Sequence, residues 1–218
     1  MTKLVLDLTT SLDGFVAGPN ITLEQPLGEG GETLHEWLFA AASWSESHGR
    51  GAGETGQDSE LYAELLESTG AVVMGRKMFS GGEGPWEDDP NARGWWGDDP
   101  PFHKPVFVLT HHAREPLEMD GGTTFTFVTD GPAAALEQAR AAAGGKDVHL
   151  AGGAQVASAF LRAGLLDVAQ IHVAPRLLGG GVRLFDGVGP ADAGFELDRV
   201  VSSPTVTHLR YRVTGGQA

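Results

Sequence analysis

The chain has 218 residues, no cysteine and a formal net charge of −14. Hydrophobic residues make up 41% and charged residues 20%, which excludes disorder of the whole chain and predicts one domain with an insertion. The missing cysteines exclude disulfides, thiolate metal sites and cysteine nucleophiles, and the negative charge disfavours nucleic acid and anionic membrane surfaces as partners.

The N-terminal segment has the pattern of a strand that feeds a loop. Residues 3–9 are rich in Leu and Val, and Asp13-Gly14 marks a turn directly after them. The chain contains no apolar run near the ~18 residues that cross a bilayer, and its start lacks a cleavage signal. We therefore expect a cytoplasmic protein that does not associate with membranes.

Residues 22–56 form the expected insertion, because their composition shifts to Gly, Glu and Ser. Within this segment Leu34, Trp37, Leu38 and Ala41 recur at helical spacing, which predicts a short amphipathic helix.

The remaining elements alternate between helices and strands. Helices are predicted at residues 60–68, 133–143 and 156–163, strands at 71–74, 105–110, 123–129, 148–151, 168–174 and 205–213, and a long irregular loop at 81–101. This alternation predicts an α/β fold with a mostly parallel sheet, and the last two strands are expected to pair antiparallel at its edge.

Two segments, residues 72–82 and 147–167, read as a buried strand that runs through glycine into a helix. Glycine lets a ligand approach the backbone, and the N-terminus of the following helix favours an anion. Two such anion sites in one small domain suggest that the protein binds a dinucleotide. The residues expected to bind it are Gly75, Arg76 and Lys77 in the first segment and Gly152, Gly153, Ala154 and Gln155 in the second. Neither segment has the spacing of a Rossmann fingerprint or of a Walker A loop.

Other candidate residues leave two interpretations open. Asp13 precedes glycine, so it serves either the turn or catalysis, and turn chemistry is the commoner role. Trp86, Trp95 and Trp96 either cover the core or form the wall of a site for a flat ligand. His111 and His112 lack a third ligand at recognisable spacing, so no metal site is expected.

Four motifs in this order resemble one known family: TTSLDGFVAGPN, VVMGRKMFSGG, PVFVLTHH and HLAGGAQVASAFLRAGLLDVAQIHVAPRLLGGGVRLFDG. They are similar to the dihydrofolate-reductase-like family, in the branch of the reductase domain of the bifunctional riboflavin-biosynthesis deaminase/reductase. The resemblance covers most of the chain, except residues 22–56 and part of residues 87–101.

The resemblance implies a three-layer sandwich with a mostly parallel central sheet and an antiparallel C-terminal edge. It also implies a homodimeric NADPH-dependent reductase that transfers hydride to a carbonyl or imine of a small heterocyclic or sugar-linked substrate. By position, the implied cofactor residues are Thr9, Val16, Ala17, Gly75, Arg76, Lys77, Thr110, His111, Gly152, Gly153, Ala154 and Gln155. The implied substrate residues are Ser11, Asp13 and Trp86, with Asp13 as the candidate catalytic acid.

Two departures from the family pattern matter. The acid that holds the pterin in dihydrofolate reductases has only a positional candidate, Glu36, and the sequence has no zinc-binding deaminase domain. The alternatives are a pterin or dihydrofolate reductase and a nucleotide-binding domain without catalysis.

Overall fold

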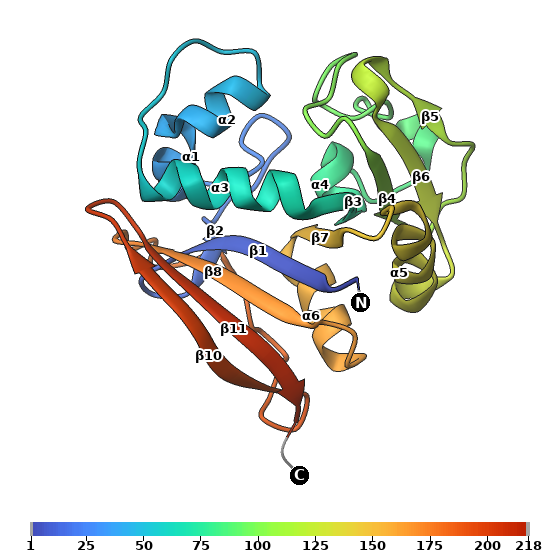
Figure 1. Ribbon diagram of the computed structural model, residues 1–218. Helices are drawn as coiled ribbons and strands as arrows, with labels where there is room; N and C mark the ends of the chain where they lie inside the picture. Colours follow the sequence, from blue (N-terminus) through green and yellow to red (C-terminus); the bar gives the residue numbers. More distant parts are fainter. Residues whose placement is uncertain (1, 217–218) are drawn as a thin grey trace.

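A computed structural model describes residues 2–216, which form an α/β structure around a nine-stranded sheet (Figure 1). The strand order is β10-β11-β8-β1-β7-β3-β4-β6-β5. The strands from β8 to β6 run parallel, whereas β11 and β10 at one edge and β5 at the other are antiparallel to their neighbours. The predicted mostly parallel sheet with an antiparallel C-terminal edge is confirmed.

The strand bounds are β1 Leu4–Ser11, β2 Phe15–Ala17, β3 Thr69–Gly75, β4 Pro105–Leu109, β5 Leu117–Glu118, β6 Thr124–Val128, β7 Asp147–Gly152, β8 Val168–Ala174, β9 Val182–Arg183, β10 Ala193–Ser202 and β11 Thr207–Gly215. The α-helices are α1 Glu36–Ala40, α2 Ala42–Ser47, α3 Gln57–Ser68, α4 Arg76–Ser80, α5 Gly131–Ala142 and α6 Ala154–Arg162. Three short 3-10 helices are η1 Gly31–His35, η2 Trp86–Asp88 and η3 Asp120–Gly122.

The two faces of the sheet are covered differently. Alternate strand residues such as Leu4, Leu6 and Leu150 pack with α5 and α6 in one apolar cluster. On the opposite face Met74 and Phe125 lie in a second cluster, covered by α4 and the loop after it. Because strand side chains alternate between faces, β3, β4 and β7 contribute to both clusters.

The predicted insertion folds as η1, α1 and α2 beside the N-terminal half of α3 (Figure 1). Leu34, Trp37 and Ala41 are buried, so the predicted apolar face is confirmed. The helix is interrupted, however, because Ala41 adopts an extended conformation with ψ of 136°.

The sequence pattern did not reveal β10 and the two-residue strands β5 and β9. β10 alternates charged and apolar residues, and most of its side chains are exposed because it is an edge strand. The closing strand β11 begins at Thr207, two residues later than predicted, because the preceding residues form the hairpin turn.

Candidate functional site

The two glycine segments lie side by side at the carboxyl ends of adjacent parallel strands, β3 and β7. Met74 pairs with Gly152, and a Cβ atom on Gly75 would lie 2.6 Å from Val156 Cγ2. Gly75 is therefore required where the end of β3 packs against α6. The carboxyl edge of an open parallel sheet is the usual place for a ligand.

The N-terminus of α6 is the best anion site in this region. The first hydrogen bond inside this turn runs from the Val156 N–H to the Gly153 carbonyl, and no side chain caps the helix. The N–H groups of Ala154 and Gln155 are thus left for a ligand. Gly153 is exposed, and a Cβ atom there would meet no heavy atom within 4 Å.

At the first glycine segment both basic side chains, which were predicted to bind a dinucleotide, already form ion pairs within the protein. Arg76 is 7% exposed, forms an ion pair with Asp89 at 2.5 Å and lies 3.5 Å from the ring centroid of Trp86. Lys77 is exposed and pairs with Glu83 at 2.6 Å. Arg76 therefore stabilises the loop after α4. The Lys77–Glu83 ion pair is exposed, so breaking it costs little free energy.

Thr110 and His111 follow β4, the next strand after β3 in the sheet. The buried Thr110 hydroxyl accepts a hydrogen bond from the His112 N–H at 3.1 Å. His111 is exposed at the same edge. Both residues therefore lie at the carboxyl edge of the sheet, beside the first glycine segment.

The end of β1 carries Thr9 and Ser11, both buried. The Trp37 Nε1–H donates to Thr9 Oγ1 at 3.2 Å, and Ser11 Oγ accepts from the Phe15 N–H at 2.9 Å. Val16 and Ala17 follow in β2, which pairs with β9 in a separate two-stranded sheet. These residues build the turn after β1, which ends at the same edge of the sheet as the two glycine segments because β1, β7 and β3 run parallel.

Asp13 acts as an anchor of this turn. Its carboxylate accepts the N–H groups of Leu178 at 3.1 Å and Gly179 at 2.8 Å. A hydrogen bond from Ser11 and these two amides lower the pKa of Asp13 to about 2. A carboxylate that is ionised throughout the neutral range does not donate a proton there, so the geometry favours the turn interpretation.

Trp86 does not lie beside Ser11 and Asp13. It packs edge-to-face against Phe127 with ring centroids 4.8 Å apart, and its Nε1–H donates to the His112 carbonyl at 2.7 Å. Strands β3 and β7 separate this region from β1. The expectation that Trp86 contacts the substrate is therefore not supported. Trp96 lies in the apolar cluster with Phe125, which fits the interpretation as core cover.

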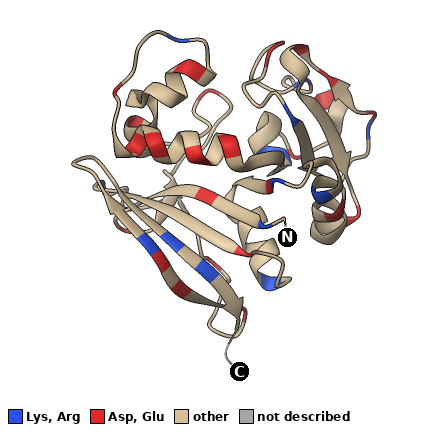
Figure 2. Cartoon of the chain, viewed as in Figure 1, with Lys and Arg blue, Asp and Glu red and all other residues tan. Residues whose placement is uncertain are grey.

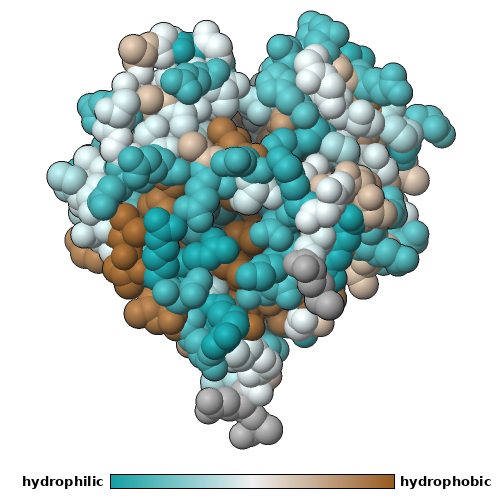
Figure 3. Space-filling view, in the orientation of Figure 1, coloured by the Kyte–Doolittle hydropathy of each residue, from teal (hydrophilic) through white to brown (hydrophobic). Residues whose placement is uncertain are grey.

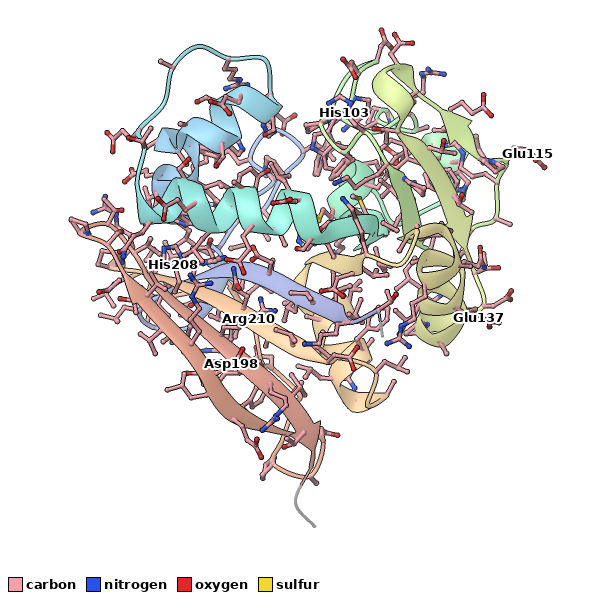
Figure 4. The ribbon with its side chains drawn as sticks, viewed as in Figure 1. His103, Glu115, Glu137, Asp198, His208 and Arg210 are labelled. Carbon is pink, nitrogen blue, oxygen red and sulfur yellow. The ribbon has the colours of Figure 1, made fainter. Side chains whose placement is uncertain are left out.

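A buried polar chain that sequence reasoning missed crosses the sheet beneath α3. His172 Nε2 lies 3.1 Å from Asp7 Oδ1, the two Nδ1 atoms of His172 and His208 are 2.6 Å apart, and His208 Nε2 lies 3.0 Å from Asp58 Oδ1. Figure 4 shows His208 on β11 directed toward α3. The only sequence signal was a single histidine within each of two strands, His172 in β8 and His208 in β11.

Three hydrogen bonds link these four groups and require three protons, so the four groups together carry a net charge of −1. Burial alone would raise the pKa of Asp7, but His172 beside it holds the pKa below its ordinary value. Burial lowers the pKa of His208, although its bond to Asp58 opposes this effect.

A cavity of about 590 Å³ opens at the carboxyl end of β8. Its walls come from α1, the start of α3, the end of β8 and the β10–β11 turn, and they include Glu36, Trp37, Glu54, Asp58, Arg176 and Ser203. Ala174, also in the wall, pairs with Ser11 of β1. The cavity therefore adjoins the end of β1.

The family model described as "RibD C-terminal domain" matches residues 2–209. A curated relative, the uncharacterized protein YyaP of Bacillus subtilis, is 26% identical over 196 residues, which cover 84% of this chain and 80% of that protein. No helix of residues 2–216 is long and apolar enough to cross a membrane.

Solved structures agree on the fold. A putative riboflavin biosynthesis protein from Shewanella sp. PV-4 has a TM-score of 0.60 at 22% identity, with 98% of this chain and 99% of that chain covered. A diaminohydroxyphosphoribosylaminopyrimidine deaminase/5-amino-6-(5-phosphoribosylamino)uracil reductase from Thermotoga maritima has a TM-score of 0.55 at 16% identity. The match covers 97% of this chain but only 56% of that protein.

Proposed function

Because the chain belongs to the RibD C-terminal domain family, the reductase domains of riboflavin biosynthesis, we propose that it is an NADPH-dependent reductase. The observation that carries this proposal is the N-terminus of α6, where two N–H groups and the exposed Gly153 leave room for a pyrophosphate. When bound, the nicotinamide supplies the hydride, and the protein supplies orientation.

The residues of this edge fit an extended dinucleotide. Gly153, Ala154 and Gln155 would hold the pyrophosphate, and Thr110 and His111 would lie at the adenosine end. Lys77, released from its exposed ion pair with Glu83, would add a cation close to this path. The turn after β1 then receives the nicotinamide end, next to the cavity.

In the proposed reaction, hydride adds to the carbon of a carbonyl or imine and the heteroatom gains a proton. Asp13 stays ionised and bound to two backbone amides, so we assign the proton to water that enters through the cavity. Asp13 then positions the turn on which the substrate and the nicotinamide meet.

The experiment is a titration of the purified protein with NADPH and NADH, read by tryptophan fluorescence, followed by turnover assays. We expect tighter binding of NADPH and oxidation of NADPH by an aminouracil of the riboflavin pathway. Reduction of dihydrofolate instead would support the pterin alternative. NADPH binding without turnover of either compound class would support a non-catalytic nucleotide-binding domain, and lack of binding would refute the proposal.

We also propose that the protein forms a homodimer through the β10–β11 ribbon. Phe195, Leu197 and Val200 of β10 are 39%, 60% and 53% exposed. Figure 3 shows apolar surface over this ribbon, and exposed apolar patches mark contacts between proteins. Size-exclusion chromatography with light scattering is expected to give twice the 22.9 kDa chain mass, and a monomer would refute this assembly.

A further inference from the structure

The cavity at the end of β8 has more acidic than basic residues in its wall. Three acidic residues, Glu36, Glu54 and Asp58, and one basic residue, Arg176, line it, and their formal charges sum to −2. Arg176 is already paired with Glu36 at 2.5 Å. Figure 2 shows the acidic residues that recur along α3.

The buried histidine pair behind the cavity does not reverse this charge. Asp7, His172, His208 and Asp58 together carry −1 when their three hydrogen bonds are satisfied. With Glu36, Glu54 and Arg176 the total stays at −2. The N-terminus of α3 adds a partial positive charge, but Asp58 and Glu60 lie in its first turn and offset it.

The shape and polarity of the cavity suit a small molecule that carries hydroxyl or amino groups. Its volume lies within the usual range for ligand sites. Trp37, Ala41 and Pro175 form the apolar part of the cavity wall. A carboxylate such as that of Glu54, which also lines the cavity, can accept hydrogen bonds from hydroxyl or amino groups of a ligand.

The rim of the cavity is fixed before any ligand binds. Asp58 Oδ2 accepts hydrogen bonds from Ser203 Oγ at 2.9 Å and Thr205 Oγ1 at 3.0 Å. These bonds hold the β10–β11 turn on the start of α3. A preorganised site loses less conformational entropy on binding.

We propose that this cavity is the substrate-binding part of the site and that it takes an uncharged or cationic, hydroxyl-bearing heterocycle while rejecting phosphate monoesters. A phosphate monoester carries −1.5 to −2 charges near pH 7, and the charged residues of the cavity wall total −2 even when the exposed Arg176–Glu36 pair is open. The Thermotoga maritima reductase is named for a phosphorylated substrate. This chain therefore differs in substrate class, an inference that rests on the proposed reductase function.

The test compares 5-amino-6-(ribosylamino)uracil with its 5′-phosphate by isothermal titration calorimetry at low salt. We expect the wild type to bind the unphosphorylated compound about tenfold more tightly or better. Glu54→Lys is expected to narrow this ratio about tenfold, since it replaces an acid with a cation in the cavity wall. Glu118→Lys, which makes the same charge change on β5 at the opposite edge of the sheet, is expected to leave the ratio unchanged.

The outcomes separate this inference from the reductase proposal. Equal or tighter binding of the phosphate by the wild type would overturn the inference, and so would a ratio that Glu54→Lys does not change. Binding of NADPH but of neither uracil compound would overturn the inference and leave the cofactor site in place. Selective binding of the unphosphorylated compound without NADPH binding would support the cavity assignment and refute the reductase.

Discussion

Replacing Gly153 with valine is expected to abolish tight NADPH binding while leaving the fold intact. The backbone of Gly153, with φ of −85° and ψ of −162°, is extended and accepts a β-branched residue. Its Cβ would meet no heavy atom within 4 Å, so the new side chain fills only the space over the N-terminus of α6.

The size of the effect follows from the two free N–H groups of Ala154 and Gln155. A hydrogen bond to a charged group contributes about 1.5–3 kcal/mol. Loss of both bonds to the pyrophosphate costs about 3–6 kcal/mol, which weakens binding by about two to four orders of magnitude.

The assay is calorimetric titration with NADPH, accompanied by urea unfolding of both proteins. Gly51→Val is the matched control, because a Cβ at Gly51 also meets no heavy atom within 4 Å and this residue lies in the insertion. Both variants are expected to unfold within about 0.5 kcal/mol of the wild type. Unchanged NADPH affinity in a folded Gly153→Val variant would show that the cofactor does not use this turn.

Three further predictions concern side chains with perturbed environments. Asp13→Asn is expected to lower the melting temperature but not to move the pH profile of turnover between about pH 5 and 8, since the carboxylate has a pKa of about 2; a shifted profile would restore Asp13 as the acid. Burial lowers the pKa of His149 and of His208 in the folded state. The stability that these two neutral side chains contribute is therefore fully present above the pKa of the unfolded state, near 6.5, and is lost as the pH falls below that value. The loss is at most about 1.4 kcal/mol per pH unit for each histidine. Urea unfolding of His149→Leu is expected to show a shallower decrease than the wild type, and an equal slope would contradict the assignment. Arg76→Met leaves the Asp89 carboxylate, 2% exposed, without its cation, so a loss of about 3 kcal/mol is expected in urea unfolding; a loss below about 1 kcal/mol would show that the ion pair is not important for stability.

The order of the central elements was predictable because each has a strong local signal. The strand at residues 168–174 was predicted with the same bounds as β8, since a continuous apolar run between turns is typical of a buried parallel strand. The glycine segments were also predicted correctly as strand-to-helix turns, and the structure places them on neighbouring strands.

The roles of individual polar side chains were less predictable, because they depend on contacts between distant segments. Arg76 was predicted to bind the cofactor, but Asp89 and Trp86 already contact it from the loop after α4. The pair of His172 and His208 is formed by strands 36 residues apart in sequence, and nothing local in either strand indicates it. The cavity likewise combines four separate segments.

The proposed cofactor site and the proposed substrate cavity are built by different segments of the chain. The proposed cofactor site comes from two strand–helix units, β3–α4 and β7–α6. The cavity is formed by the insertion, the start of α3, the end of β8 and the β10–β11 turn. Under the proposed assignment, substitutions in the cavity segments are expected to change the substrate without altering the turns that would hold the hydride donor. A library confined to residues 33–59 and 202–205 would search for new reductase specificities while keeping the same cofactor requirement.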